Sequence, residues 1–222
     1  MDNTTFKTRL TDRTPLFGTF VKTPHPIVIE ILARAGYDFA VIDAEHGPFD
    51  RATLDVMMIA GRAAGLPLVV RVPVTTPDWM LFTLDAGAAG LMVPHVNSVE
   101  DATTLARSMR YGGDGTRGFA GTTRAAGYQA RSMVEHLDRT PHETVLIAQI
   151  EDPPGADAYE QIAAVDGIDA LFVGRADLAV GYGRQSFFDP DVADRSRRVL
   201  GATGSATGLY CAPGEDIAPH RA

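Results

Sequence analysis

The chain has 222 residues, of which 45% are hydrophobic, and a formal net charge of -8 at pH 7. This length allows a full hydrophobic core, and the acidic balance argues against nucleic-acid binding, which usually needs a basic face. A single cysteine, Cys211, excludes an internal disulfide and suits a reducing cytoplasm. The first ten residues lack the apolar core of a signal peptide, and no apolar run approaches the roughly 20 residues of a membrane helix. We therefore expect a soluble cytoplasmic protein.

Short apolar runs alternate with alanine-rich helical patterns along the chain. Each run is bounded by glycine, proline or polar residues, which is typical of a buried strand. In chain order, the predicted strands are residues 16–20, 39–42, 68–73, 90–95, 145–151, 170–174 and 208–212. The predicted helices are residues 27–35, 52–64, 99–109 and 156–165, with the beginning of a further helix at 214–222. The alternation predicts one α/β domain over residues 1–222, a parallel sheet covered by helices.

Polar side chains collect at the same end of successive predicted strands. This arrangement favours a closed barrel over an open sheet, so we expect a (β/α)8 TIM barrel. Counted from residues 16–20, the chain supplies about seven strands where a full barrel has eight. The eighth strand and the final helix are therefore expected to be missing, which would leave the first and seventh strands with unpaired edges.

Two acidic residues follow consecutive predicted strands. Glu151 ends the run 145–151 and Asp177 follows the run 170–174, so a barrel would place them side by side. Two carboxylates, supplemented by water and substrate oxygens, suit Mg²⁺, Mn²⁺ or Co²⁺, and no His/Cys cluster with zinc spacing competes. The alternative is that Glu151 belongs to a surface loop and that Asp177 caps the helix after it.

A glycine and an arginine near these acids suggest a site for an anionic substrate. Gly174 would let backbone N–H groups approach a ligand closely, and a helix N-terminus attracts an anion such as a substrate carboxylate. Arg71 lies inside an otherwise β-branched run and would donate to a keto or enolate oxygen while a carbon–carbon bond breaks. The alternative for Arg71 is a salt bridge to a neighbouring acid, because a buried arginine needs a partner.

His46 is the candidate proton carrier, because the unperturbed pKa of imidazole lies near neutrality. Asp43 and Glu45 precede it and are assigned supporting roles only. Asp85 is predicted to orient His46 and to stabilise its charge. His95 also ends a predicted strand. It and the other remaining histidines lack comparable neighbours and are interpreted as structural: His25, His95, His136, His142 and His220.

Taken together, these segments resemble the HpcH/HpaI aldolases over roughly residues 16–183. Residues 36–48, GYDFAVIDAEHGP, look like the signature of that family. Further matching segments follow in the same order: VRVP at 70–73, LDAGA at 84–88, MVP at 92–94, RY at 110–111, GTRG at 115–118, QIE at 149–151 and GRADL at 174–178.

The resemblance implies a metal-dependent, pyruvate-producing class II aldolase, a group that includes 4-hydroxy-2-oxo-heptanedioate and 2-keto-3-deoxy sugar acid aldolases. It also implies a (β/α)8 barrel assembled into homo-hexamers. The site residues that it implies are the metal ligands Glu151 and Asp177, the substrate-binding residues Gln149, Gly174, Asp177 and Leu178, and the catalytic residues His46, Arg71 and Asp85.

Two features depart from the family pattern. Arg175 stands where the family usually has proline, and an extra cation beside the metal could alter carboxylate binding or substrate preference. The second departure is the expected lack of the eighth strand and final helix.

The leading hypothesis is a lyase that cleaves a 4-hydroxy-2-oxo acid to pyruvate and an aldehyde. A Schiff-base mechanism is disfavoured, because Lys7 and Lys22 are the only lysines and neither ends a late predicted strand. One alternative is a citrate-lyase-β-like enzyme acting on acyl-CoA, for which the acidic composition offers no obvious basic patch. The other is an inactive remnant of an aldolase.

Overall fold

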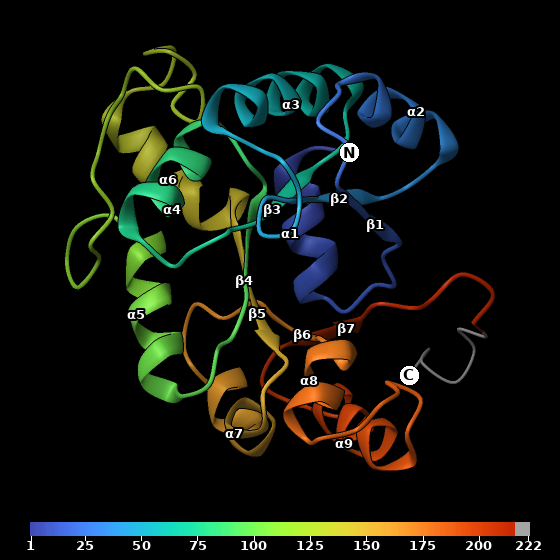
Figure 1. The fold of residues 1–222 in the computed structure, drawn as a ribbon. Helices are drawn as coiled ribbons and strands as arrows, with labels where there is room; N and C mark the ends of the chain where they lie inside the picture. The colour runs from blue at the N-terminus through green and yellow to red at the C-terminus, as the bar shows by residue number, and fades with distance from the viewer. Residues whose placement is uncertain (216–222) are drawn as a thin grey trace.

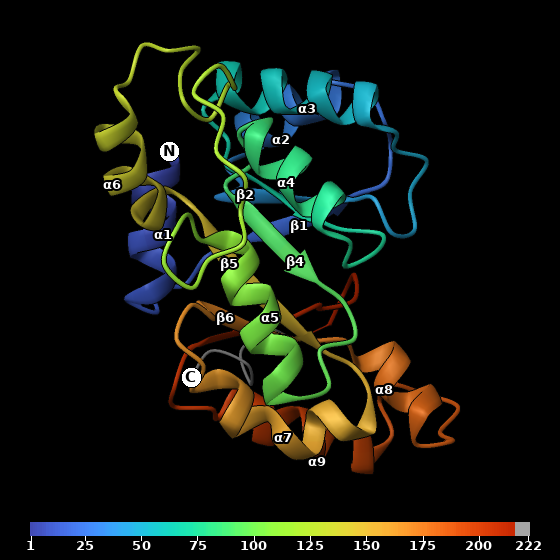
Figure 2. The same ribbon diagram turned by 90° about the vertical axis from the view of Figure 1, so that its left-hand side faces the viewer.

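A computed structural model describes residues 1–215 of the chain. Its strands form one parallel sheet in the order of the sequence, and Figures 1 and 2 show this sheet curled, with helices around its outer side. The strands are β1 (Gly18–Val21), β2 (Phe39–Asp43), β3 (Leu68–Arg71), β4 (Gly90–Val93), β5 (Val145–Ile150), β6 (Ala170–Val173) and β7 (Ala206–Leu209).

Apart from α1, which precedes β1, the helices lie in the connections that return the chain to the beginning of the next strand. They are α1 (Asn3–Thr11), α2 (Ile27–Ala35), α3 (Arg51–Ala64), α4 (Pro77–Asp85), α5 (Val99–Met109), α6 (Met133–Glu143), α7 (Pro153–Ala163), α8 (Arg175–Gly181) and α9 (Pro190–Leu200). Within residues 1–215, none of them is long and apolar enough to cross a membrane.

Local signals in the sequence set the ends of several helices. Asp50 begins α3 by accepting a hydrogen bond from the backbone N–H of Thr53 at 2.7 Å, and Gly65 ends it in the left-handed conformation, φ 66°. Ser132 and Glu135 form a reciprocal capping box at the beginning of α6. These caps satisfy backbone groups that the helix itself leaves unpaired.

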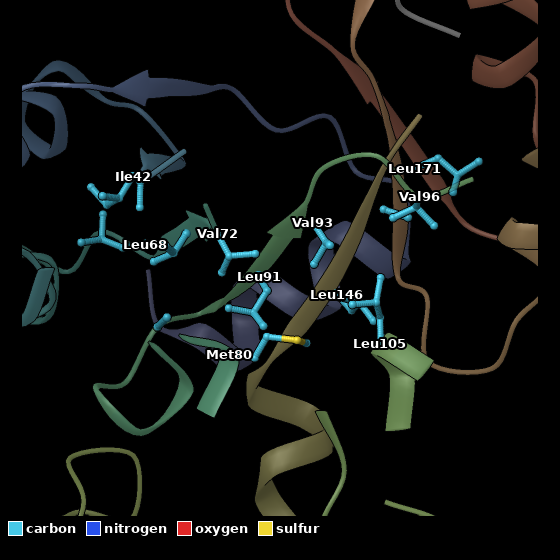
Figure 3. Packing of buried hydrophobic residues seen from close by; sticks show 14 of the residues in the cluster. Ile42, Leu68, Val72, Met80, Leu91, Val93, Val96, Leu105, Leu146 and Leu171 are labelled. Carbon is cyan, nitrogen blue, oxygen red and sulfur yellow. The ribbon is translucent and has the colours of Figure 1, made fainter. Parts of the chain in front are cut away.

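The two faces of the sheet bury different sets of side chains, because successive residues of a strand point to opposite faces. The face toward the helices carries Ile42, Leu68 and Leu91, which belong to one apolar cluster with Met80 of α4 and Leu105 of α5 (Figure 3). The inner face of the curl holds a separate apolar cluster, to which α1 contributes one side chain: Phe6, Val41, Val69, Ala89, Met92, Val145, Ile147, Ala170 and Ala206.

The structure confirms an α/β fold with parallel strands, and every predicted strand is present. The last strand, expected at 208–212, instead spans Ala206–Leu209. Within the described part of the chain, β1 pairs with β2 alone and β7 with β6 alone, so these strands do not close a ring. Most of the helix expected at 214–222 lies outside the described residues.

Candidate active site

The predicted site residues come mainly from the C-terminal ends of four parallel strands. Asp43 is the last residue of β2, Arg71 is the last residue of β3, and Glu151 directly follows β5. Gly174 lies between β6 and α8. Strands that run in the same direction end at the same rim, so the fold brings these residues to one side of the curled sheet.

Arg71 and Asp43 form a two-pronged ion pair in this rim. The register of β2 and β3 places the two residues opposite each other, and Arg71 donates from Nε and Nη2 to the Asp43 oxygens at 3.0 and 2.8 Å. Asp43 is fully buried, and burial alone would raise its pKa. Hydrogen bonds from Arg71 and from the His46 backbone, with the Arg71 charge, outweigh burial and lower the Asp43 pKa below its usual value. The salt bridge considered as an alternative for Arg71 therefore exists.

Glu45 connects this ion pair to two histidines. Its Oε2 lies 3.2 Å from Arg71 Nε and 3.8 Å from His46 Nε2. Its Oε1 lies 3.9 Å from His95 Nε2. The His46 side chain is 55% exposed, so its imidazole remains accessible to a ligand, and Glu45 is the acid that accompanies it.

Glu151 is buried at the end of β5 and surrounded by polar groups. The backbone N–H of His95 donates to its Oε1 at 2.9 Å, and Gln149 Nε2 donates to its Oε2. Burial raises the pKa of Glu151 to about 7, and the charges of Asp177 and Glu45 add to this effect while His95 opposes it. Glu151 is therefore a carboxylate whose negative charge is poorly compensated by the groups around it.

Gly174 is required by the close approach of β6 to Glu151. A Cβ on Gly174 would lie 2.5 Å from Glu151 Oε2 and 3.0 Å from Gln149 Nε2, closer than side-chain contacts allow. The N–H of Gly174 already donates to Ile150 O, and the N–H of Leu178 donates to Gly174 O, both at 3.0 Å. The backbone donors left for an anion at this turn are therefore those of residues 175–177, the first turn of α8.

The donor atoms around Glu151 fit a hard divalent cation. Asp177 lies in the first turn of α8, close enough to raise the Glu151 pKa by its charge. The Oε1 of Gln149 is buried and has no hydrogen-bond partner within residues 1–215. The same residues contain no group of three or more His, Cys, Asp or Glu placed to hold a metal. Two carboxylates would thus need oxygens from water or substrate to complete the coordination.

Within the single chain that is described, Asp85 is not paired with His46, so its role beside His46 stays a prediction. It is the last residue of α4, and a helix that follows a strand carries the chain back to the opposite end of the sheet. There Asp85 accepts from Arg117 Nη2 at 3.1 Å, whereas the ion pairs of residues 1–215 join His46 to Glu45 alone.

Arg175 is not a free cation beside the site. Its guanidinium forms two hydrogen bonds to the Glu215 carboxylate, at 2.7 and 2.6 Å, and another to Tyr210 O at 2.7 Å. The same group stacks on Phe187, 5.1 Å from the ring centroid. Arg175 therefore holds the segment after β7 against α8, which corrects the expectation of an extra charge available to the metal.

His95 was treated as structural, yet it lies at the centre of the acidic cluster. Its Nδ1 lies 2.8 Å from Asp152 Oδ2 and 3.6 Å from Glu151 Oε1. Burial would lower the His95 pKa, but the hydrogen bond that the imidazole donates to Asp152 and the charges of the nearby carboxylates outweigh burial and raise that pKa. Its position at the end of a strand was the one sequence signal that could have identified it.

A well-defined cavity among the described residues lies elsewhere. It has a volume of about 580 Å³ and is lined by residues at the beginnings of β3 and β4, including Leu68 and Ala88, together with Arg117 and Arg124. The rim that carries Arg71 and Glu151 is at the other end of these strands. We place the site by the chemistry of its side chains, because size alone does not identify where a reaction occurs.

Comparisons with known proteins identify the family of the chain. A family model described as HpcH/HpaI aldolase/citrate lyase matches residues 16–212. The hydroxypyruvate/pyruvate aldolase of Roseovarius nubinhibens is 34% identical over 221 residues, which cover 98% of this chain and 86% of that protein. The 5-keto-4-deoxy-D-glucarate aldolase of Enterobacter sp. is 33% identical over 178 residues, covering 80% of this chain and 69% of that protein.

Solved structures show the same relationship. The crystal structure of an HpcH/HpaI aldolase/citrate lyase family protein from Burkholderia cenocepacia superposes with a TM-score of 0.88 at 38% identity, covering 94% of this chain and 84% of that one. The crystal structure of the citrate synthase SbnG gives a TM-score of 0.84 at 31% identity, covering 96% of this chain and 84% of that one.

Proposed function

The chain belongs to the HpcH/HpaI aldolase/citrate lyase family, and from this we propose that it is a class II aldolase that cleaves a 4-hydroxy-2-oxo acid to pyruvate and an aldehyde. The observation that carries the proposal is that one rim of the sheet holds both Arg71, paired with Asp43, and Glu151, a buried carboxylate whose pKa burial raises to about 7. The curled sheet is, in this proposal, the seven-strand part of a (β/α)8 barrel, and the homo-hexamer expected from the sequence is retained as a prediction.

A divalent cation, Mg²⁺, Mn²⁺ or Co²⁺, held by Glu151 and Asp177 would supply a Lewis acid that polarises the 2-oxo group of the substrate. Burial keeps water away from the Glu151 carboxylate, which strengthens its attraction for a positive charge. Gln149 donates from Nε2 to Glu151, and its buried Oε1, which has no partner among residues 1–215, would accept a hydrogen bond from the substrate.

Arg71 stabilises the charge that develops at the 2-oxo oxygen. Asp43 uses the Nε and Nη2 donors and thereby fixes the plane of the guanidinium. The remaining Nη1 is outside that pair and is the donor that we assign to the substrate. A fixed donor needs no reorganisation when the enolate forms, so it lowers the barrier more than a mobile group.

His46 moves the proton. As a base it takes the proton of the 4-hydroxyl, the bond between C3 and C4 breaks, and the aldehyde leaves while the electron pair passes to the enolate of pyruvate. Return of the proton to C3 completes pyruvate. Glu45, at 3.8 Å from His46 Nε2, takes the orienting role in this chain that the sequence had assigned to Asp85.

The substrate carboxylate would be bound by the first turn of α8. The N–H groups of residues 175–177 have no acceptor inside the helix. Gly174 contributes space and not a donor, because its own N–H is bonded to Ile150 O. Leu178, whose N–H is likewise used, is buried and supports the turn by packing.

The test is pyruvate release from a panel of 4-hydroxy-2-oxo acids by the wild type, before and after EDTA treatment, and by Glu151→Gln. Loss of the charged ligand should lower turnover about a thousandfold, because the cation supplies several kcal/mol of transition-state stabilisation. Asp138→Asn, an exposed acid on α6, is the control and should behave as the wild type. Undiminished turnover after EDTA treatment would exclude the class II assignment.

A further inference from the structure

The turn after β4 holds a histidine in an unusual backbone conformation. His95 has φ 56°, in the left-handed region. Non-glycine residues rarely adopt this region, because Cβ comes too close to the backbone. The other non-glycine residues with positive φ, Arg13, Tyr128 and Gln129, lie in segments away from the rim. At His95 the surrounding structure must therefore hold the backbone in place.

This conformation directs the His95 backbone N–H at the end of the next strand. The N–H donates to Glu151 Oε1 at 2.9 Å, linking the end of β4 to the residue that follows β5. The neighbouring Val96 N–H donates to Gln149 O at 3.3 Å, which seats the same turn on β5. The turn therefore fixes one oxygen of the Glu151 carboxylate relative to the sheet.

The imidazole holds the turn from the other side. His95 Nδ1 lies 2.8 Å from Asp152 Oδ2, and Asn97 Nδ2 donates to the same oxygen at 3.1 Å. Asp152 is the N-cap residue of α7, yet its side chain makes no capping hydrogen bond. Pro153 and Pro154 follow it and have no N–H to offer, so the Asp152 carboxylate is available for the turn.

We infer that His95 is a positioning residue that sets the Glu151 carboxylate for cation binding through its backbone N–H, with the imidazole and Asp152 holding the left-handed turn. The inference rests on the proposed function, since it concerns the same Glu151. It assigns the effect to backbone conformation, so substitutions at His95 should act according to their tolerance of positive φ.

Two substitutions at His95 distinguish the effect of its backbone conformation on cation binding from the effect of its imidazole. Glycine lacks the imidazole but adopts positive φ readily, whereas valine is β-branched and does not. Mn²⁺ binding to the purified full chain, measured from the loss of the free-ion electron paramagnetic resonance signal, reports on Glu151 without any substrate. We expect His95→Gly to bind Mn²⁺ within roughly threefold of the wild type, and His95→Val to bind it about tenfold or more weakly.

Controls make the result specific. Gln129→Val places valine at another exposed position with positive φ, 71°, and should leave Mn²⁺ affinity unchanged. This control tests whether backbone strain elsewhere in the chain lowers the affinity. Thermal unfolding confirms that each variant is folded, and His95→Asn, which tolerates positive φ, should restore affinity relative to His95→Val if the valine variant proves unstable.

The outcomes are distinct. Wild-type Mn²⁺ affinity in His95→Val, with binding lost in Glu151→Gln, overturns this inference and leaves the proposed function standing. Equal weakening in His95→Gly and His95→Val overturns it too, because the imidazole itself would then be the group that binds. A wild type that binds no divalent cation overturns the proposed function together with the inference.

Discussion

Replacing Gly174 by alanine should damage the site by pushing Glu151 out of place. The new Cβ would lie 2.5 Å from Glu151 Oε2 and 2.6 Å from Glu151 Cβ. Carbon contacts are normally about 3.5–4.0 Å, so the carboxylate has to move by roughly 1 Å. Gly174 has φ -90°, so alanine adds no backbone strain and the effect is one of space.

The magnitude follows from this displacement. Ligands hold a cation within about 0.2 Å of the ideal distance, and a misplacement of about 1 Å costs about a hundredfold in turnover. Overpacking also costs about 1–3 kcal/mol of unfolding free energy. For a chain of this size, that loss lowers the melting temperature by about 2–4 °C per kcal/mol.

The assay measures Mn²⁺ affinity, pyruvate release and thermal unfolding of Gly174→Ala. Gly208→Ala on β7 is the matched control, because its Cβ would make an ordinary contact 3.4 Å from the Phe172 ring. The control should retain wild-type affinity and turnover. A Gly174→Ala protein with wild-type Mn²⁺ affinity and turnover would refute the placement of Glu151 as a cation ligand against this glycine.

Further substitutions test the other assigned roles. His46→Ala should lower cleavage by about two to four orders of magnitude, as for a general acid–base group, and an unchanged rate and pH profile would make His46 structural. Asp177→Asn should weaken cation binding while the chain stays folded, measured by Mn²⁺ titration and circular dichroism; unchanged affinity would remove Asp177 from the ligand set. His136 is buried, and burial with the charges of Arg117 and Arg131 lowers its pKa. Below about pH 6.5 the unfolded chain therefore binds more protons at His136 than the folded chain does. The unfolding free energy should accordingly decrease as the pH is lowered through this range. His136→Gln should reduce this slope, whereas the exposed-site control His142→Gln should not; equal slopes in all three proteins would contradict the assignment.

The strands could be predicted because their apolar runs are short and bounded by glycine and proline. Some helices lacked an equally clear pattern. The α4 segment, Pro77–Asp85, has buried residues at only a few positions, and α6 carries Pro141 inside it. The α1 segment contributes one buried side chain, Phe6. Amphipathic periodicity is weak in α1 and α4, so tertiary packing and caps decide that these two helices form.

The placement of a candidate residue could be predicted where a strand end itself carries it, as with Arg71 and Glu151. The position of Asp85 was harder to predict, because it ends a helix and the chain reverses direction between the end of β3 and the end of α4. His95 was missed because its contribution is a backbone N–H in a left-handed turn, and residue type alone does not specify that conformation. The partner of Arg175, Glu215, is 40 positions away and is brought close by the segment after β7.

Deuterium exchange at the methyl group of pyruvate tests the central claim most directly, because it needs the enolate chemistry and no knowledge of the aldehyde. In D₂O, followed by proton nuclear magnetic resonance, the wild type with Mg²⁺ or Mn²⁺ should exchange the methyl protons. Exchange should be lost after EDTA treatment, restored by the cation, and suppressed in Arg71→Ala and Glu151→Gln. Exchange that persists in the EDTA-treated wild type and in both variants, or no exchange in the cation-loaded wild type, would contradict the account.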